Sequence, residues 1–163
     1  MAIKKLVLDD FFEEEDFSLI GIHCTIEDYR LAFLLNKVLD IKLSRQDSDI
    51  DNNNRKTTFS LFEWEDSAQF KTWNLVSNTC KVLSNQINEN SLDSLFSFNE
   101  TITKIHHLVP EYSKANYLLK INNALNKKKE KLILNKILNI DQVITAYSIA
   151  TNELKSKDQL IFN

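Results

Sequence analysis

The chain has 163 residues and a formal net charge of −3, with 43% hydrophobic and 26% charged residues. These values suit one globular domain, and the small negative charge gives no global attraction to nucleic acids or anionic lipids. A single glycine, Gly21, and a single proline, Pro110, exclude glycine-rich phosphate loops and nucleophile elbows, which need glycine for tight turns.

The N-terminal ten residues combine two lysines with a short apolar run, and acids follow at once. No small-residue cleavage site is visible, so we expect a first strand here rather than a signal peptide. No apolar stretch approaches the roughly 20 residues that span a bilayer. We therefore expect a cytoplasmic protein without membrane contact, in which Cys24 and Cys80 are free thiols.

In the first half, residues 17–24 have apolar side chains on both faces, which is typical of a central strand. Thr25 as N-cap and the helical spacing behind it predict a helix over 26–39, with Tyr29 and Phe33 in its core stripe. The following pattern indicates an antiparallel meander. Its expected parts are a strand at 41–44, a loop at 47–54, strands at 57–64 and 70–77, and a turn at 65–67.

In the second half, residues 84–100 are rich in Ser and Asn and are predicted to form a long surface loop with one helical turn. An extended stretch is expected at 102–109, where Pro110 keeps its neighbour out of the helical region. A strand at 116–121, a helix at 124–139 and a strand at 143–150 complete the chain.

The order strand, helix, strand over 116–150 predicts a βαβ unit on a shared sheet, and residues 17–46 have the same order. We therefore predict a single α+β domain over residues 1–163, with a mixed or mainly antiparallel sheet and two main helices. A ferredoxin-like or ACT-like arrangement is the nearest named architecture by element order, and such a fold implies no function.

Histidine and cysteine residues give little support for a metal site. On strands, His23 and Cys24 point to opposite faces, and so do His106 and His107. No CxxC or HxxxH pair starts a zinc site. A scattered site of His23, Cys24, Cys80 and one of His106 or His107 stays an alternative, but we expect no metal and no cofactor.

Two charged clusters are interpreted first as solvated surface. The acidic run at 9–16 lacks the ligand spacing and the glycine of a calcium loop. The only basic cluster consists of Lys127, Lys128, Lys129 and Lys131. Aromatic side chains for base stacking are not interleaved with these lysines, so nucleic-acid binding is the less favoured interpretation.

Aromatic residues gather on two neighbouring predicted strands. They are Phe59, Phe62, Trp64, Phe70 and Trp73. In an antiparallel pair these side chains would contact one another across the strands. Packing in a core or interface is therefore preferred to an aromatic ligand pocket.

Glu111 is the most pointed candidate for a site, because it directly follows the rigid Pro110 and has Tyr112 and Tyr117 nearby. One interpretation is a carboxylate held for a ligand or a partner. The other, which we prefer, is a structural turn in which Glu111 accepts hydrogen bonds from backbone N–H groups.

The string of residues 109–117, Val-Pro-Glu-Tyr-Ser-Lys-Ala-Asn-Tyr, resembles the signature of the IPExxxVDY family of small, functionally uncharacterised bacterial proteins. Pro110, Glu111 and Tyr117 match the signature, while Asn116 stands where the family has aspartate. That departure removes a charge, so the resemblance implies no catalytic role for the motif here. Further similar stretches are residues 29–36, 117–121, 143–147 and 154–162.

We expect a non-enzymatic binding or scaffold module that self-associates, or binds a protein partner not identified by the sequence, through a sheet edge or a helix face. One alternative is a small enzyme with a dispersed site, such as Glu111 with His106 or His107. Another is an RNA-associated accessory protein that uses residues 127–131.

Overall fold

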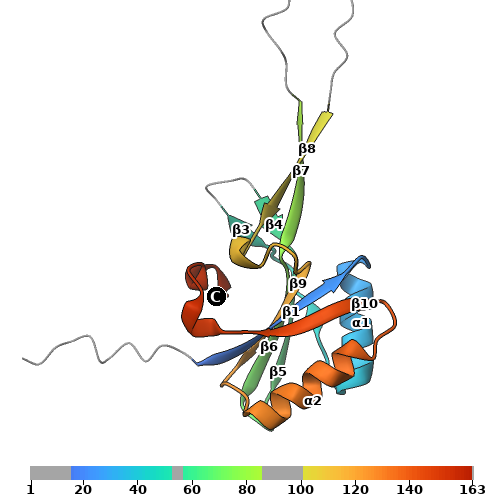
Figure 1. The fold of residues 1–163 in the computed structure, drawn as a ribbon, viewed down its shortest axis with the longest axis vertical. Coiled ribbons are helices and arrows are strands. Elements are labelled where there is room, and N and C mark those ends of the chain that lie inside the picture. The colour runs from blue at the N-terminus through green and yellow to red at the C-terminus, as the bar shows by residue number, and fades with distance from the viewer. Residues whose placement is uncertain (1–15, 53–56, 86–100, 163) are drawn as a thin grey trace, which may run out of the picture.

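The computed structural model describes residues 16–52, 57–85 and 101–162 (Figure 1). Its main sheet has six strands, and every neighbouring pair is antiparallel. In spatial order the strands are β10 (Val143–Ile149), β1 (Phe17–Cys24), β9 (Tyr117–Asn122), β6 (Lys71–Ser77), β5 (Leu61–Asp66) and β2 (Ser44–Arg45). The predicted α+β class with a mainly antiparallel sheet is confirmed.

Two helices and two separate hairpins complete the regular structure of the described residues. The helices are α1 (Asp28–Leu39) and α2 (Lys127–Leu138). The hairpins pair β3 (Ile50–Asn52) with β4 (Thr57–Phe59) and β7 (Thr79–Asn85) with β8 (Thr101–His107). Short 3-10 turns are η2 (Pro110–Tyr112), η3 (Thr151–Glu153) and η4 (Lys157–Leu160).

The predicted strand–helix–strand unit lies on one sheet, with β1 inserted between β9 and β10. Because β1 is antiparallel to both neighbours, β9 and β10 run in the same direction. In the same way β1 and β6 run in parallel on either side of β9. A helix follows β1 and another follows β9, so this order is compatible with a ferredoxin-like arrangement of two split βαβ units.

The sheet is buried on both faces, as the two-sided apolar pattern of residues 17–24 predicts. Ile20, Ile22 and Cys24 pack in a core with the inner sides of α1 and α2. Leu19 and its face of the sheet pack in a second core against the C-terminal segment, defined here as residues 150–162. Figure 1 shows this red segment folded back beside the sheet, away from both helices.

Several element boundaries differ from the prediction. Helix α1 begins at Asp28, and the residue at its N-cap is Glu27, which makes no side-chain capping bond, so the capping role predicted for Thr25 is wrong. Helix α2 begins only at Lys127, where the Asn126 side chain accepts a hydrogen bond from the Lys129 N–H.

The strand predicted at 57–64 is divided at Ser60, whose carbonyl accepts a hydrogen bond from the Ser77 N–H at 3.0 Å. Its first part, β4, pairs with β3, which lies in the region predicted as a loop. Its second part, β5, belongs to the main sheet. The following turn comes later than predicted, because β5 continues to Asp66. The Asp66 carboxylate then accepts from the Ala68 N–H at 3.0 Å.

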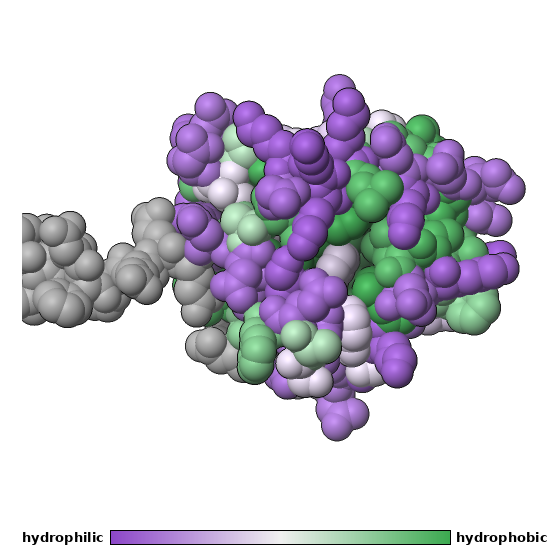
Figure 2. Space-filling model, turned by 90° about the horizontal axis from the view of Figure 1, so that it is seen from below, coloured by the Kyte–Doolittle hydropathy of each residue, from purple (hydrophilic) through white to green (hydrophobic). Residues whose placement is uncertain are grey.

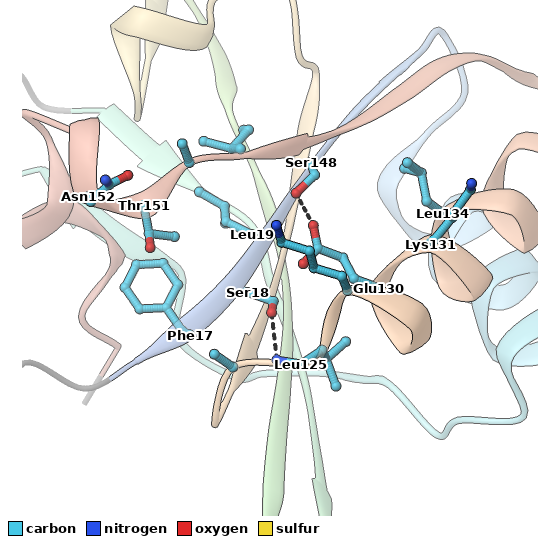
Figure 3. Close-up of a pocket in the computed structure, with 14 residues that line it drawn as sticks. Phe17, Ser18, Leu19, Leu125, Glu130, Lys131, Leu134, Ser148, Thr151 and Asn152 are labelled. Carbon is cyan, nitrogen blue, oxygen red and sulfur yellow. Dashed lines mark hydrogen bonds between the residues drawn. The ribbon is translucent and has the colours of Figure 1, made fainter.

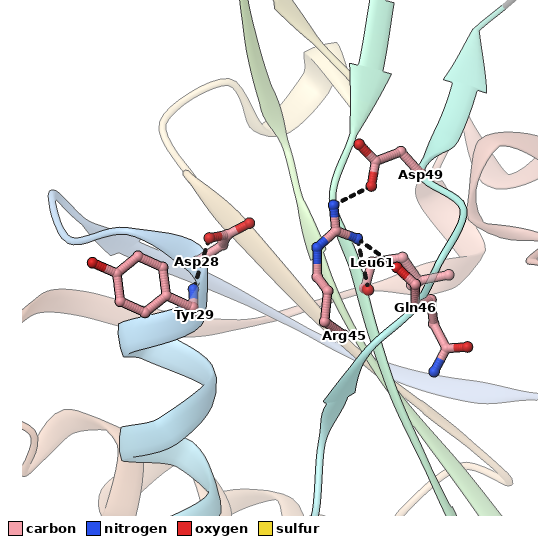
Figure 4. Close-up of polar contacts among 6 residues, drawn as sticks. All are labelled: Asp28, Tyr29, Arg45, Gln46, Asp49 and Leu61. Atoms are coloured by element: carbon pink, nitrogen blue, oxygen red, sulfur yellow. Dashed lines mark hydrogen bonds and ion pairs between the residues drawn. The ribbon is translucent and has the colours of Figure 1, made fainter.

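The edge strand β2 is short because side chains take over its pairing. Of the strand predicted at 41–44, only Ser44 joins the sheet, and β2 continues to Arg45. The Asn36 side chain instead holds Leu43, donating to its carbonyl at 3.0 Å and accepting from its N–H at 2.8 Å. Figure 4 shows Arg45 donating to the carbonyls of Gln46 and Leu61 and pairing with Asp49.

Residues 84 and 85 of the long loop predicted at 84–100 belong to β7, and the other residues of that prediction, 86–100, lie outside the described part of the chain. Of the extended stretch predicted at 102–109, residues 102–107 lie in β8, which pairs with β7. Figure 1 shows this hairpin projecting from the sheet. The first strand predicted near residues 6–8 and nearly all of the acidic run at 9–16 also lie outside the described residues.

Gly21 is required by the ring of Tyr147, its directly opposite residue on β10. A Cβ added at Gly21 would lie 3.0 Å from Tyr147 Cε2 and 3.2 Å from Ile149 Cδ1. We expect Gly21→Val to lower the free energy of unfolding by about 1–3 kcal/mol, because the larger side chain overpacks this contact. Urea denaturation would measure it. Adding Tyr147→Ala should recover part of the loss; a strictly additive double variant would contradict this explanation.

Candidate functional site

The family-like motif forms a turn that is organised by Asn78, a residue between β6 and β7 that is fully buried. The Asn78 amide donates to the carbonyls of Tyr112 and Ala115 at 3.0 and 2.9 Å. Its Oδ1 accepts from the Val109 N–H at 2.7 Å. Pro110 begins η2 directly after Val109, which is extended, as the proline requires. One buried side chain therefore holds both ends of the motif turn.

Glu111 binds the C-terminal segment. One carboxylate oxygen accepts from the backbone N–H groups of Lys155 and Ser156 at 2.9 and 2.8 Å, and the other accepts from the Ser156 hydroxyl at 2.8 Å. Desolvation acts to raise the pKa of Glu111, but hydrogen bonds from its own backbone N–H, Ser156 and Lys155 outweigh it and lower the pKa. The geometry corresponds to the structural interpretation, in which the carboxylate accepts backbone hydrogen bonds.

Asn116 and Tyr117 connect the motif to the end of β1. The Asn116 Oδ1 accepts from the Cys24 N–H at 3.1 Å and lies 2.6 Å from His23 Nδ1. The Tyr117 hydroxyl donates to the carbonyl of Ile26 at 2.7 Å, in the connection that leads to α1. Burial, with smaller contributions from Cys24 and nearby acids, raises the pKa of Tyr117, so its hydroxyl stays protonated as a donor. Both side chains therefore stabilise the end of β1 and its connection to α1 by hydrogen bonds.

The four predicted basic residues lie on the exposed surface of the first turns of α2. Lys127 and Lys131 line an open groove of about 530 Å³ between α2 and the ends of β1 and β10, whereas Lys128 and Lys129 do not (Figure 3). In this α2 groove the Glu130 carboxylate accepts a hydrogen bond from the Ser148 hydroxyl. The basic cluster is therefore divided between two surfaces.

The second open groove, of about 570 Å³, lies against α1. It is lined by Tyr29, Arg30, Phe33, Leu34 and Gln142. Tyr29 and Phe33 are 61% and 68% exposed, so their predicted place in the core stripe is wrong. The helix buries Leu31, Ala32 and Leu35 instead.

Figure 4 shows the Tyr29 ring projecting away from the helix. In Figure 2, hydrophobic side chains on the lower face of the molecule gather on the side where Figure 1 places α1 and the start of β10. We call the surface formed by Tyr29, Phe33 and Leu34 the α1 face. A helix with apolar residues in more positions than one side can bury is the sequence signal for such a surface.

The residues of the predicted alternative metal and catalytic sites do not come together in one site. No group of three or more His, Cys, Asp or Glu side chains that could hold a metal occurs within residues 16–52, 57–85 and 101–162. Cys24 lies in the core under the helices, where burial raises the pKa of its thiol. Cys80 pairs in register with His106, on the strand pair that projects from the sheet. Glu111 has both oxygens bound to the C-terminal segment and is hydrogen-bonded to neither His106 nor His107.

The predicted aromatic cluster is divided between packing and solvent. Trp64 and Trp73 are directly opposite on β5 and β6, with ring centroids 6.3 Å apart. Phe59 and Phe62 are buried on opposite faces of the fold, in the two different cores. Phe70 is 84% exposed in the turn that follows β5. These rings line no common pocket among the described grooves.

None of the protein-family models, curated proteins or solved structures compared with the chain matches it. The resemblance of residues 109–117 to the IPExxxVDY signature therefore stays a prediction. Among the described residues, no helix is long and apolar enough to cross a membrane.

Proposed function

We propose that this protein is a non-enzymatic binding module that self-associates through the α1 face. The observation that carries the proposal is the exposure of Tyr29 and Phe33, two aromatic residues one helical turn apart beside an open groove. Aromatic residues are enriched in protein interfaces because they bury a large area with few rotatable bonds. Neither ring is needed for the core, since Leu31, Ala32 and Leu35 already fill the inner side of α1.

The polar residues around these rings suit an interface rim. Arg30 lies beside Phe33 in the groove lining and forms an exposed ion pair with Glu27 at 3.6 Å. A positive and a negative group on one surface allow a two-fold arrangement, in which Arg30 of one copy faces Glu27 of the other. The contacts of the family-like motif support a non-enzymatic role, because Glu111 and Tyr117 are engaged in holding the fold.

The test is the mass of the protein in solution, measured by size-exclusion chromatography with light scattering over a range of concentrations. We expect a concentration-dependent dimer, and we expect Tyr29→Ser with Phe33→Ser to shift it to monomer by weakening association about 100-fold or more. Circular dichroism would check that the variant is folded.

Phe70→Ser is the matched control, because Phe70 is also an exposed aromatic residue but lies at the turn after β5. It should leave the mass unchanged. A strict monomer at all concentrations would overturn the proposal, and so would equal effects of the α1 and Phe70 variants.

A further inference from the structure

We propose that the α2 groove binds an acidic, extended peptide segment of a partner protein. This groove lies between α2 and the ends of β1 and β10, and it shares no lining residue with the groove of the α1 face. The inference therefore does not rest on the proposed self-association.

The shape of the α2 groove fits an extended chain. Figure 3 shows one wall formed by α2, with Lys131 and Leu134, and an opposite wall formed by the segment that follows β10, with Thr151 and Asn152. Its volume of about 530 Å³ is within the range of ligand sites, but small ligands are usually mostly enclosed. Here Lys127, Lys131 and Asn152 are exposed at the rim, so the groove is open to solvent along its length. An extended peptide can bind in a groove that stays open to solvent on one side.

The charges of the groove favour carboxylates. Lys127 and Lys131 are one helical turn apart on the α2 wall, and neither forms an ion pair with an acid of the described chain. Glu130 is the single acidic residue among the described lining residues, and its carboxylate accepts a hydrogen bond from the Ser148 hydroxyl while keeping its charge, so the two lysines leave the lining with one net positive charge. A peptide carboxylate would therefore be attracted to the lysine wall and kept away from the side of Ser148.

The spacing of the two lysines predicts the peptide pattern. Four residues of helix place Lys127 and Lys131 about 6 Å apart along the α2 axis. Alternate residues of an extended chain point to the same side and are about 7 Å apart. Two acids separated by one residue can thus face both lysines. The residues that alternate with these acids point to the opposite side of the extended chain, so apolar residues there suit Phe17 and Leu19, which line the groove away from α2 (Figure 3).

The test measures binding of the fluorescein-labelled peptide Gly-Phe-Glu-Leu-Glu-Phe-Gly to the full chain by fluorescence anisotropy. We expect saturable binding that weakens as salt is raised, and no binding of the same peptide with Gln in place of Glu. Lys127→Glu with Lys131→Glu should weaken binding by about tenfold or more.

Lys128→Glu with Lys129→Glu is the matched control, because it makes the same charge change on the same turn of α2 but outside the groove. It should change the affinity by less than about twofold. The Tyr29→Ser, Phe33→Ser variant should bind the peptide normally, which separates this outcome from that of the self-association test.

Three results would overturn the inference: no binding at about 1 mM peptide, equal binding of the Gln peptide, or equal losses in the two lysine variants. Binding that appears only after Glu13→Gln, Glu14→Gln and Glu15→Gln would also overturn the assignment to a partner. It would give the groove to the acidic residues that precede Asp16 in this same chain.

Discussion

Replacing Asn78 with alanine is expected to lower the free energy of unfolding by roughly 2–5 kcal/mol, because several buried backbone groups lose their partner. The side chain is fully buried and bonds to Val109, Tyr112 and Ala115, which lie more than 30 residues away. Alanine would remove the hydrogen-bond partner of one backbone N–H and two backbone carbonyls. The family-like turn should therefore be the first region to loosen.

Urea denaturation followed by circular dichroism would measure this loss. Asn135→Ala is the control, because the Asn135 side chain is exposed in the last turn of α2, and it should change the free energy of unfolding by less than about 0.5 kcal/mol. Asn78→Asp should be at least as harmful as alanine, since it replaces the donating amide with a buried charge. A loss for Asn78→Ala no larger than that of the control would contradict the role assigned to this residue.

The second large effect is expected for Leu160→Ala, at roughly 2–5 kcal/mol. Leu160 is fully buried in the core on the non-helical face of the sheet. Its carbonyl accepts from the Nζ of Lys120, a buried lysine whose Nζ also lies 5.0 Å from the centre of the Phe17 ring. Removing the leucine side chain leaves a cavity beside this charged group, so the C-terminal segment should lose its main anchor.

The neighbouring Ile161 provides a matched control, because it is 63% exposed although it is also a large aliphatic residue. Ile161→Ala should cost less than about 0.5 kcal/mol in the same urea experiment. Limited proteolysis would locate the effect, with faster cleavage within 150–162 for Leu160→Ala only. Similar small losses for both variants would show that the segment is not anchored through Leu160.

The sequence predicted the elements whose cause is local. Residues 17–24 were predicted as a central strand because both faces are apolar, and the strand occupies these residues in the sheet. The α+β class followed from periodicity. The strand β3 was predicted as a loop, and β2 was predicted at 41–44 instead of 44–45, because the pairing of both depends on partners and side chains elsewhere in the chain.

The candidate surfaces were harder to predict than the elements. The Lys127 to Lys131 cluster was recognisable by composition, but its division between the α2 groove and open solvent depends on the packing of α2 against β10. The apolar excess of α1 was visible, yet periodicity does not say which of its apolar residues face the sheet. Tyr29 and Phe33 are exposed because Leu31, Ala32 and Leu35 occupy the inner side.

The turn at Pro110 has features that follow from the local sequence and others that follow from tertiary contacts. The sequence by itself determined that Val109 is extended and that a turn begins at Pro110, because the proline ring restricts the backbone on both sides of its peptide bond. Only the tertiary structure decided the roles of Asn78 and Glu111. Asn78 bonds to this turn from more than 30 residues away, and Glu111 bonds to residues 44 and 45 positions further along the chain. Such contacts form only when segments far apart in the sequence pack side by side, and a local residue pattern does not say which distant segments will meet.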